Sequence, residues 1–344
     1  MQRFILVVFI LALLIPVAAF GQGEVNKTGV TAANFLKLDV GARSIGLAGA
    51  MISQANDGST MIYNPAGIAG FDKITFTYHN IDLYADIRQQ FTGVVVPFGE
   101  ANAIGFFVNY VDLGYIFRTT IEEQNGQADQ FIFNSNIAYG LTFARQLTDR
   151  VLFGVTAKYA VEKIWTESAV GVSFDFGTVY EPGVGGLKLG LAVKHLGPDM
   201  RMDRGPAATF YKVVEDAYPQ NRTIPARLIT DKYRLPTTFT AGASFDFIGP
   251  TSVLMANDVH RFTFVSEVND AFDAAIRSIT ALEYEFDNMV SIRGGTRQNY
   301  DLFSWSMGGG LKIPVGNSEL LFDYAYADYG DLEGVYVTSL EIRF

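Results

Sequence analysis

The chain of 344 residues contains no cysteine, which excludes disulfides, thiol nucleophiles and thiolate metal ligands. It is also poor in positive charge, with 26 Lys and Arg against 36 Asp and Glu and a formal net charge of −10. Such an acidic chain is a poor ligand for nucleic acid, so no nucleic-acid partner is expected. Beyond its first residues the chain lacks any apolar run of the roughly 20 residues that a membrane-spanning helix needs. A helical membrane protein is therefore excluded.

The one continuous apolar run lies at the N-terminus. Arg3 supplies a positive charge, residues 4–15 are apolar and uncharged, and small residues follow up to Gly21. This layout predicts a cleaved secretory signal peptide over residues 1–21. A single-helix anchor is the competing interpretation, and it is disfavoured because the run is shorter than a bilayer-spanning helix.

What the chain does contain is apolar and aromatic residues spread at period two, in a sequence that is 49% hydrophobic and 14% aromatic. In the last segment Tyr336, Leu340, Ile342 and Phe344 alternate with polar residues. Such alternation is typical of strands that have one apolar and one polar face. Fourteen strands are expected: 72–79, 85–98, 102–113, 130–147, 150–163, 168–180, 187–197, 236–247, 251–265, 276–286, 289–298, 303–314, 318–328 and 335–344.

The lengths of the connections test this count. Single-chain bacterial barrels have an even number of strands, with short turns on the periplasmic side and longer loops outside. The long connections, 114–129 and 198–235, both follow odd-numbered strands, and the connections after even-numbered strands are expected to be tight turns such as 248–250. The sequence thus predicts an all-β fold: a 14-stranded antiparallel transmembrane β-barrel over residues 71–344, in contact with outer-membrane lipid. A soluble β-sandwich or propeller is the alternative, disfavoured by the terminal aromatic residue and the one-sided loops.

Residues 22–70 do not alternate like membrane strands and are rich in Gly and Ala. A barrel of fourteen strands has an interior too wide for its own side chains to fill. We therefore expect this segment to form a hatch inside the barrel. Within it, Asn64, Pro65, Ala66 and Gly67 either gate a passage or fix the turn into the first strand. The structural role is favoured because Pro restricts Asn64 to extended conformations and Gly67 permits a tight turn.

At this point the chain resembles a known family. Its motifs are Gly41-Ala-Arg-Ser-Ile-Gly-Leu-Ala-Gly-Ala50, in which Gly41, Arg43, Gly46 and Gly49 stand out, then Asp57-Gly-Ser-Thr, Tyr63-Asn-Pro-Ala-Gly67 and Arg234-Leu-Pro-Thr-Thr-Phe239. They are similar to the PorV/PorQ family, within the FadL-like superfamily of outer-membrane barrels with an N-terminal hatch. The extended stretch 205–232 departs from the compact PorV pattern and leaves a client-binding surface in doubt.

The resemblance implies two functions. PorV-type members are non-enzymatic components of type IX secretion, and their partners are translocon subunits and secreted client proteins. FadL-type members carry hydrophobic small molecules through the barrel and out through a lateral gap in the wall. We expect the first function, with the second as the alternative; a purely structural barrel and an enzyme such as a barrel lipase rank below both. The resemblance also implies that the barrel-assembly machinery reads the last strand at Tyr336, Leu340, Ile342 and Phe344.

No catalytic, cofactor-binding or metal-binding residue is predicted. His79, His195 and His260 lie far apart in sequence, and no metal-ligand spacing joins them. Charged residues on the inner faces either select a permeant or pair across the lumen and with the hatch, and pairing is favoured. They include Lys158, Glu162, Glu283, Glu285, Arg293 and Arg297.

Two further features have open interpretations. Gly294-Gly295 and Gly308-Gly-Gly310 lie within strands, where glycine marks a bend or a close approach; alternatively, they accommodate the hatch or a lateral opening. The outer loop 198–235 contains a possible short helix at 210–218 and is either a binding surface for a partner or an ordered lid. Its candidate interface residues are Met200, Arg201, Met202, Phe210 and Tyr211.

Overall fold

A computed structural model describes residues 29–54, 56–119, 123–124, 131–202, 208–212, 223–227, 229–300 and 302–344. In 208–212 and 223–227 only the backbone is described. The expected signal peptide, 1–21, lies outside these ranges, as do residues 22–28 of the expected hatch. Among the helices in the described ranges, none has the length and apolar character needed to cross a membrane.

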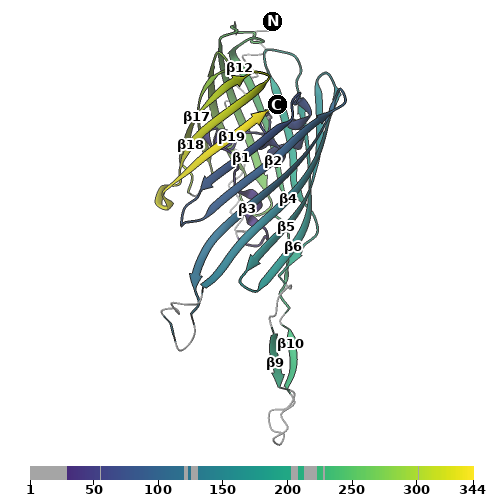
Figure 1. Ribbon diagram of the computed structural model, residues 1–344, viewed down its shortest axis with the longest axis vertical. Coiled ribbons are helices and arrows are strands. Elements are labelled where there is room, and N and C mark those ends of the chain that lie inside the picture. Colours follow the sequence, from purple (N-terminus) through teal and green to yellow (C-terminus); the bar gives the residue numbers. More distant parts are fainter. Residues whose placement is uncertain are drawn as a thin grey trace, which may run out of the picture.

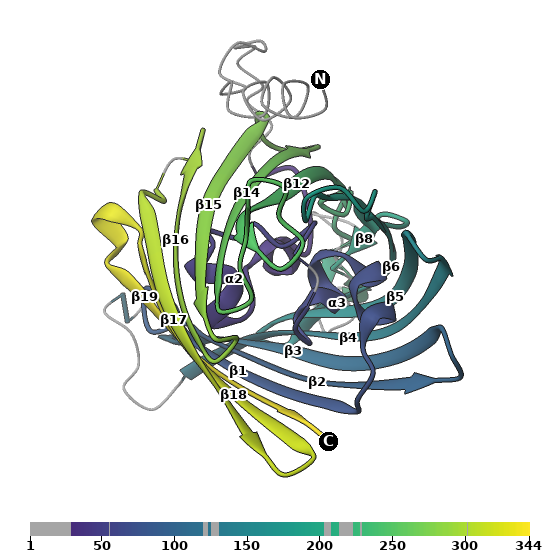
Figure 2. The same ribbon diagram turned by 90° about the horizontal axis from the view of Figure 1, so that it is seen from above.

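Antiparallel strands close into a barrel (Figures 1 and 2). The main sheet has 15 strands, and leaving out the two-residue β13 (Met255–Ala256), which adds parallel to β12, gives fourteen. The ring closes because β7 pairs with β12 and β1 pairs with β19. The barrel strands are β1 (Thr75–Asp82), β2 (Arg88–Phe98), β3 (Asn102–Phe117), β4 (Phe131–Thr148), β5 (Val151–Ile164), β6 (Glu167–Tyr180), β7 (Lys188–Leu196), β12 (Thr238–Gly249), β14 (His260–Ala271), β15 (Arg277–Phe286), β16 (Val290–Gln298), β17 (Trp305–Val315), β18 (Ser318–Asp328) and β19 (Gly334–Arg343).

The predicted fold is confirmed, with one displaced strand. The ninth strand was expected at 251–265, directly after a tight turn at 248–250, but β14 begins at His260. The side chain of Ser252 explains the difference. Its hydroxyl donates to the carbonyl of Phe247 and accepts the N–H groups of Leu254 and Met255, which holds residues 250–259 as a folded loop. A polar side chain that satisfies backbone groups locally competes with strand pairing.

The outward face of the wall is apolar. On β19, Tyr336 and Phe344 are 49% and 59% exposed, whereas Val337 between them is fully buried. The same alternation holds on β4, where Leu141 and Phe143 are exposed outside and Ala144 is buried inside. The predicted outward face of the last strand, Tyr336, Leu340, Ile342 and Phe344, is confirmed, opposite buried Ser339 and Glu341. Lipid tolerates such a surface, and water does not.

The described residues of the expected hatch, 29–54 and 56–70, lie inside the ring of strands (Figure 2). The segment contains four short helices: η2 (Asn34–Lys37), α2 (Ala42–Gly46), α3 (Thr60–Tyr63) and η3 (Pro65–Gly70). Its apolar side chains form three clusters with the wall, one of which joins Phe35 and Leu36 to residues of β3, β4, β5 and β6. Another joins Ile45, Leu47 and Met51 to residues of β14, β15, β18 and β19, and the third joins Met61 and Ile68 to residues of β2 and β3. The hatch therefore supplies the core that the wall alone lacks.

The connection between β7 and β12 is built from short strand pairs. β8 (Met200–Arg201) pairs with β11 (Lys232–Tyr233), and β9 (Ala208–Lys212) pairs with β10 (Thr223–Arg227). The β9–β10 hairpin projects beyond the end of the barrel opposite to the C-terminus (Figure 1). The short helix expected at 210–218 is wrong for residues 210–212, which are extended and paired; the rest of that range lies outside the described residues.

Candidate functional site

Asn64 fixes the hatch to itself and to the wall. Its fully buried side-chain oxygen accepts the N–H of Ala66 at 3.2 Å, which caps η3. Its amide nitrogen donates to the carbonyl of Ile52 at 2.7 Å and to that of Thr178 in β6 at 3.1 Å. The turn Asn64-Pro65-Ala66-Gly67 is therefore an anchor of the hatch, in line with the structural role favoured by its sequence.

Replacing Asn64 with alanine is expected to loosen residues 60–70. The change leaves three backbone groups without their partners in a buried place, each worth about 1 kcal/mol. Hydrogen exchange of the amides of η3 should become at least tenfold faster, while exchange in β5 and β6 changes little. Unchanged protection of η3 would show that the turn is held by packing alone.

The hatch packs closely against glycines of the barrel wall. A Cβ on Gly154 of β5 would lie 2.3 Å from the carbonyl carbon of Pro65, and one on Gly177 of β6 would lie 2.0 Å from the side-chain oxygen of Asn64. Gly295 and Gly308 are similarly placed against α2 and the turn that follows it, with hatch atoms 2.9 Å and 3.2 Å from such a Cβ. Close approach of the hatch, one interpretation of the strand glycines, is thereby confirmed at Gly295 and Gly308.

The glycines of the motif Gly41 to Ala50 lie close to the wall or adopt backbone conformations that other residues rarely adopt. Gly41 and Gly49 have φ of +93° and +89°, a region that other residues rarely adopt. A Cβ on Gly49 would lie 2.6 Å from the guanidinium of Arg297, and one on Gly46 would lie 3.2 Å from the backbone of Gly308. These positions need glycine for conformation and for space.

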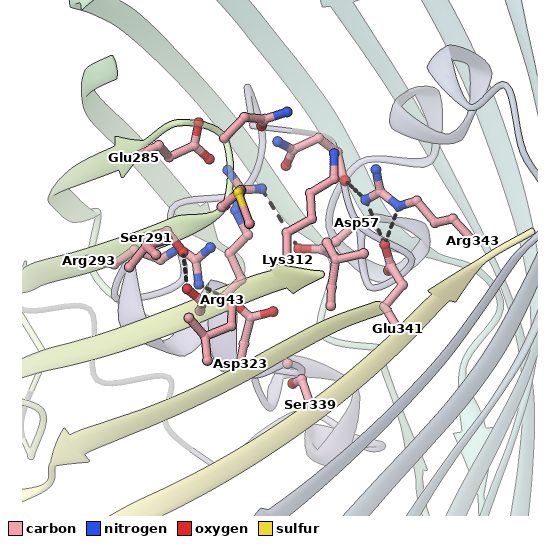
Figure 3. A pocket seen from close by; sticks show the side chains of 18 of the residues that line it. Arg43, Asp57, Glu285, Ser291, Arg293, Lys312, Asp323, Ser339, Glu341 and Arg343 are labelled. Carbon is pink, nitrogen blue, oxygen red and sulfur yellow. Dashed lines mark hydrogen bonds and ion pairs between the residues drawn. The ribbon is translucent and has the colours of Figure 1, made fainter. Parts of the chain in front are cut away.

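Arg43, the charged residue of the same motif, is part of a buried network of ion pairs. Its guanidinium donates to Glu283 of β15 at 2.7 Å and lies 3.8 Å from Asp57. Glu283 also accepts Arg293 of β16 at 2.6 Å, and Arg293 pairs in turn with Asp323 of β18. Every member is buried or nearly so, and Figure 3 shows several of them around one cavity.

The other inner-face charges that the sequence singled out are also partnered. Lys158 pairs with Asp175 of β6, and Arg297 pairs with Asp39 of the hatch. Glu285 lies 3.8 Å from Arg261, and Glu162 has the backbone of Ala33 as a hydrogen-bond partner. Pairing, the favoured interpretation, is confirmed with the hatch, and the remaining pairs join nearby strands of the wall.

The outer end of the hatch is tied to a loop. Lys37 and Thr31 each donate to the same carboxylate oxygen of Asp273, at 2.6 Å. Burial by itself raises the pKa of Asp273, but the hydrogen bonds from Lys37 and Thr31 outweigh it and hold the pKa below its usual range.

A carboxyl with a lowered pKa stabilises the fold above its unfolded pKa, and that stability is lost as pH falls through the folded pKa. Amides of residues 31–37 are therefore expected to lose protection against hydrogen exchange below about pH 4. In Asp273→Asn they should exchange fast at every pH, with no acid transition. A transition that persists in this variant would place its origin elsewhere.

Among the described residues, two cavities lie against the body of the hatch, and a third lies at its end beside Ala69 and Gly70. The first, of about 100 Å³, lies near the C-terminus and is shown in Figure 3; its walls include Arg43, Asp57, Lys312, Glu341 and Arg343. The second, of about 80 Å³, lies at the other ends of the strands and is lined by Leu36, Lys37, Leu38, Asp39, Gly49, Ile52, Ile62, Tyr63, Lys194, His195, Thr238, Thr240, Glu267, Asn269, Ala271, Arg277, Ile279, Arg297 and Tyr300. No residue lines both the first and the second, so the hatch separates an inner cavity from an outer one.

The three histidines occupy separate places. His79 lies between Thr77 and Ser339, and His260 contacts Tyr284, while His195 lines the outer cavity. Within the described ranges, no group of three His, Asp or Glu side chains is placed to hold a metal ion.

The candidate interface residues of the outer loop are only partly at the surface. Met200 is 1% exposed and packs against Gly171 of β6, so its assignment to an interface is wrong: an apolar side chain beside a glycine gap is buried there. Arg201 and Met202 are half-buried. Phe210 and Tyr211 belong to β9, and their side chains lie outside the described residues.

The chain resembles solved structures over most of its length. The monoaromatic hydrocarbon channel CymD matches with a TM-score of 0.58 at 14% identity, over 91% of this chain and 98% of that one. The toluene transporter TbuX of Ralstonia pickettii matches at 0.53 and 14% identity, over 88% and 97% of the two chains. TodX, the toluene transporter of Pseudomonas putida, matches at 0.54 and 10% identity, over 87% and 96%. The chain has the 14-stranded barrel fold of these channels.

At these identities the likeness shows the fold alone. No protein-family model matches the chain, and no curated protein matches it either. The narrower PorV/PorQ assignment stays a prediction. The outer cavity also contains charged groups that were not singled out from the sequence, namely Asp39, Lys194, Glu267 and Arg277. The signal for Lys194 and Arg277 was present, because they are charged residues at inward positions of expected strands, whereas Glu267 lies outside the expected strands.

Proposed function

We propose that this FadL-like barrel carries small, mainly apolar molecules across the outer membrane, the alternative of the two functions that the resemblance implies. The observation that carries the proposal is the match over nearly the whole of both chains to hydrocarbon channels, with the hatch in the lumen. In this proposal the chain resides in the outer membrane, reaches it by a cleaved signal peptide, and is inserted by assembly machinery that reads the strand ending in Phe344.

Passage past the hatch requires a movement or a side exit, because the two cavities are separate. A candidate exit is the ladder between β6 and β7, whose register shifts at Phe174 and Phe176. At the shift His195 has a φ of +59°, and its N–H donates to the side chain of Asp175 at 2.8 Å. A ladder interrupted in this way is the place where the wall opens at least cost.

Toluene uptake by cells tests the proposal. A Gram-negative host that lacks hydrocarbon channels should take up toluene several-fold faster when it makes this barrel than when it makes an unrelated barrel of equal abundance. An unchanged rate would overturn the proposal.

The absence of cysteine permits a reversible control. The backbone nitrogen of Ala48 in the hatch lies 3.1 Å from the hydroxyl of Ser306 in β17. An Ala48→Cys, Ser306→Cys variant should form a disulfide that locks the hatch to the wall. Uptake is expected to fall on oxidation and to return on reduction. Equal uptake in both states would show that the hatch does not move and would favour exit through the wall.

A second candidate function, protein binding as in PorV-type secretion components, is favoured by one observation. Asp112, Ser135 and Lys163 lie side by side on β3, β4 and β5 and face outward. Below them the outward residues of β4 are apolar or aromatic from Ile137 to Phe143, over about 20 Å along the tilted strand. Above them lies a cluster of exposed aromatic side chains: Tyr115, Phe117, Phe131 and Phe133.

This aromatic cluster beyond the apolar band is a candidate contact surface for translocon subunits or secreted client proteins. Pull-down of the tagged barrel in detergent distinguishes the two functions. Recovery of such proteins, lost in a Tyr115→Ser, Phe133→Ser variant, together with no toluene uptake, would favour protein binding.

A further inference from the structure

We propose that the outer cavity is a binding site for a small organic anion, a carboxylate carried on an apolar part no larger than a single ring. This inference rests on the proposed transport function and names the substrate class of the same barrel. It departs from a purely hydrocarbon ligand because the cavity presents buried positive charge.

The cavity is built from inward positions on four adjacent strands. Lys194 of β7 is paired in register with Thr238 of β12, and Thr240 lies two residues along the same strand. Thr240 is opposite Asn269 of β14, which is opposite Arg277 of β15. Since side chains of one strand face project to the same side, these residues converge on one patch of wall. The hatch covers the patch from within.

Two cations of this patch have no carboxylate partner among the described residues. The ammonium of Lys194 lies over the ring of Tyr63, 5.6 Å from its centre, and forms no ion pair with any of those residues. The guanidinium of Arg277 lies 4.4 Å from the ring centre of Tyr300, and its buried Nε has no hydrogen-bond partner there. His195, which is 1% exposed and lines the same cavity, has an Nδ1 that forms no hydrogen bond with the described residues and lies 3.8 Å from the carboxylate of Asp175.

The other charges of the cavity are already engaged. Lys37 pairs with Asp273, and Arg297 pairs with Asp39. Glu267 accepts the backbone N–H of Ile52 at 2.6 Å, so part of its carboxylate is used by the hatch. It is the one remaining acid among the lining residues, against Lys194 and Arg277. The cavity thus has an excess of one positive charge.

Charge and size together define the ligand. A buried cation without a partner is costly, and a carboxylate placed between Lys194 and Arg277 offsets that cost with charge-assisted hydrogen bonds. Ile52, Ile62 and Ile279 supply apolar walls, and the rings of Tyr63 and Tyr300 flank the two cations. A volume of about 80 Å³ admits a small ring and excludes a long acyl chain.

Calorimetric titration of the full-length barrel in detergent tests the inference, with benzoate and toluene as probes of equal ring size. Benzoate is expected to bind saturably. Lys194→Met and Arg277→Met should each weaken benzoate binding by roughly tenfold or more, because each removes a charged hydrogen bond. Arg277→Lys, which keeps the charge but loses the planar fork, should weaken it less than Arg277→Met. Lys188→Met is the matched control, since Lys188 lies on the same strand but pairs with Glu181 outside the cavity.

The outcomes separate this inference from the proposed function. Equal benzoate affinity in the wild type and in both Met variants, at native heat stability, would overturn the anion site. Toluene binding as tight as benzoate binding would overturn it as well. Toluene uptake without benzoate binding would support the transport function and contradict the anion site. Benzoate binding that depends on Lys194, combined with no uptake of either probe by cells that make the barrel, would support the anion site and contradict the transport function.

Discussion

Glu283→Ala is expected to lower the free energy of unfolding by about 3–5 kcal/mol, the usual loss when one partner of a buried ion pair is removed. Glu283 accepts hydrogen bonds from Arg43 of the hatch and Arg293 of the wall, at 2.7 Å and 2.6 Å. Its removal leaves two buried guanidinium groups sharing only Asp57 and Asp323. Denaturant unfolding in detergent, followed by tryptophan fluorescence, measures the loss.

Glu181→Ala provides the matched control for this prediction. Glu181 also accepts an ion pair, from Lys188 at 2.8 Å, but both side chains are substantially exposed. Exposed pairs contribute between 0 and about 1 kcal/mol. If both variants lose the same small amount, the network around Glu283 is not what fastens the hatch to the wall.

Gly154→Ala is expected to displace the hatch at the cost of about 1–3 kcal/mol, the usual penalty of overpacking. The added methyl group would lie 2.3 Å from the carbonyl carbon of Pro65 and 2.5 Å from the nitrogen of Ala66. These are backbone atoms, so no side-chain rotation relieves the collision. Hydrogen exchange should show loss of protection in residues 60–70, and benzoate or toluene uptake should rise.

Gly294→Ala is the matched control, because Gly294 lies in a barrel strand but its added methyl group would have 3.7 Å to the nearest atom, the carbonyl oxygen of Ser306. Its exchange pattern is expected to be that of the wild type. Equal effects of the two substitutions would show that glycine in the strands serves the wall and has no part in receiving the hatch.

The strands and their order were predictable because each is a local pattern. Alternation along β19 or β4 depends only on the neighbours of each residue, and a lipid face and a water face impose it on every strand alike. The prediction was wrong at 251–265, where apolar residues suggested a strand but the hydroxyl of Ser252 holds the backbone in a loop. A hydroxyl that satisfies nearby backbone groups leaves no periodic trace in the sequence.

The candidate site was predictable in part. The motifs around Arg43 and Asn64 were singled out, and pairing of the inner-face charges was expected, but the partners were not. Arg43 meets Glu283 across 240 residues, and Asn64 meets Thr178 across 114. Met200, read as a surface residue from its position in a long loop, is buried against Gly171 because β8 folds back over β6.

The sequence by itself determined the class of protein: an acidic, cysteine-free chain whose period-two strands end in Phe344 and whose Gly-rich N-terminal segment needs a place to lie. Only the tertiary structure decided what that segment does. It lies in the lumen, fastened at Asn64, Arg43 and Lys37, and it divides the interior into two cavities. The physical reason is that strand periodicity is a short-range property. The convergence of Lys194 and Arg277 on one cavity depends on how the barrel closes.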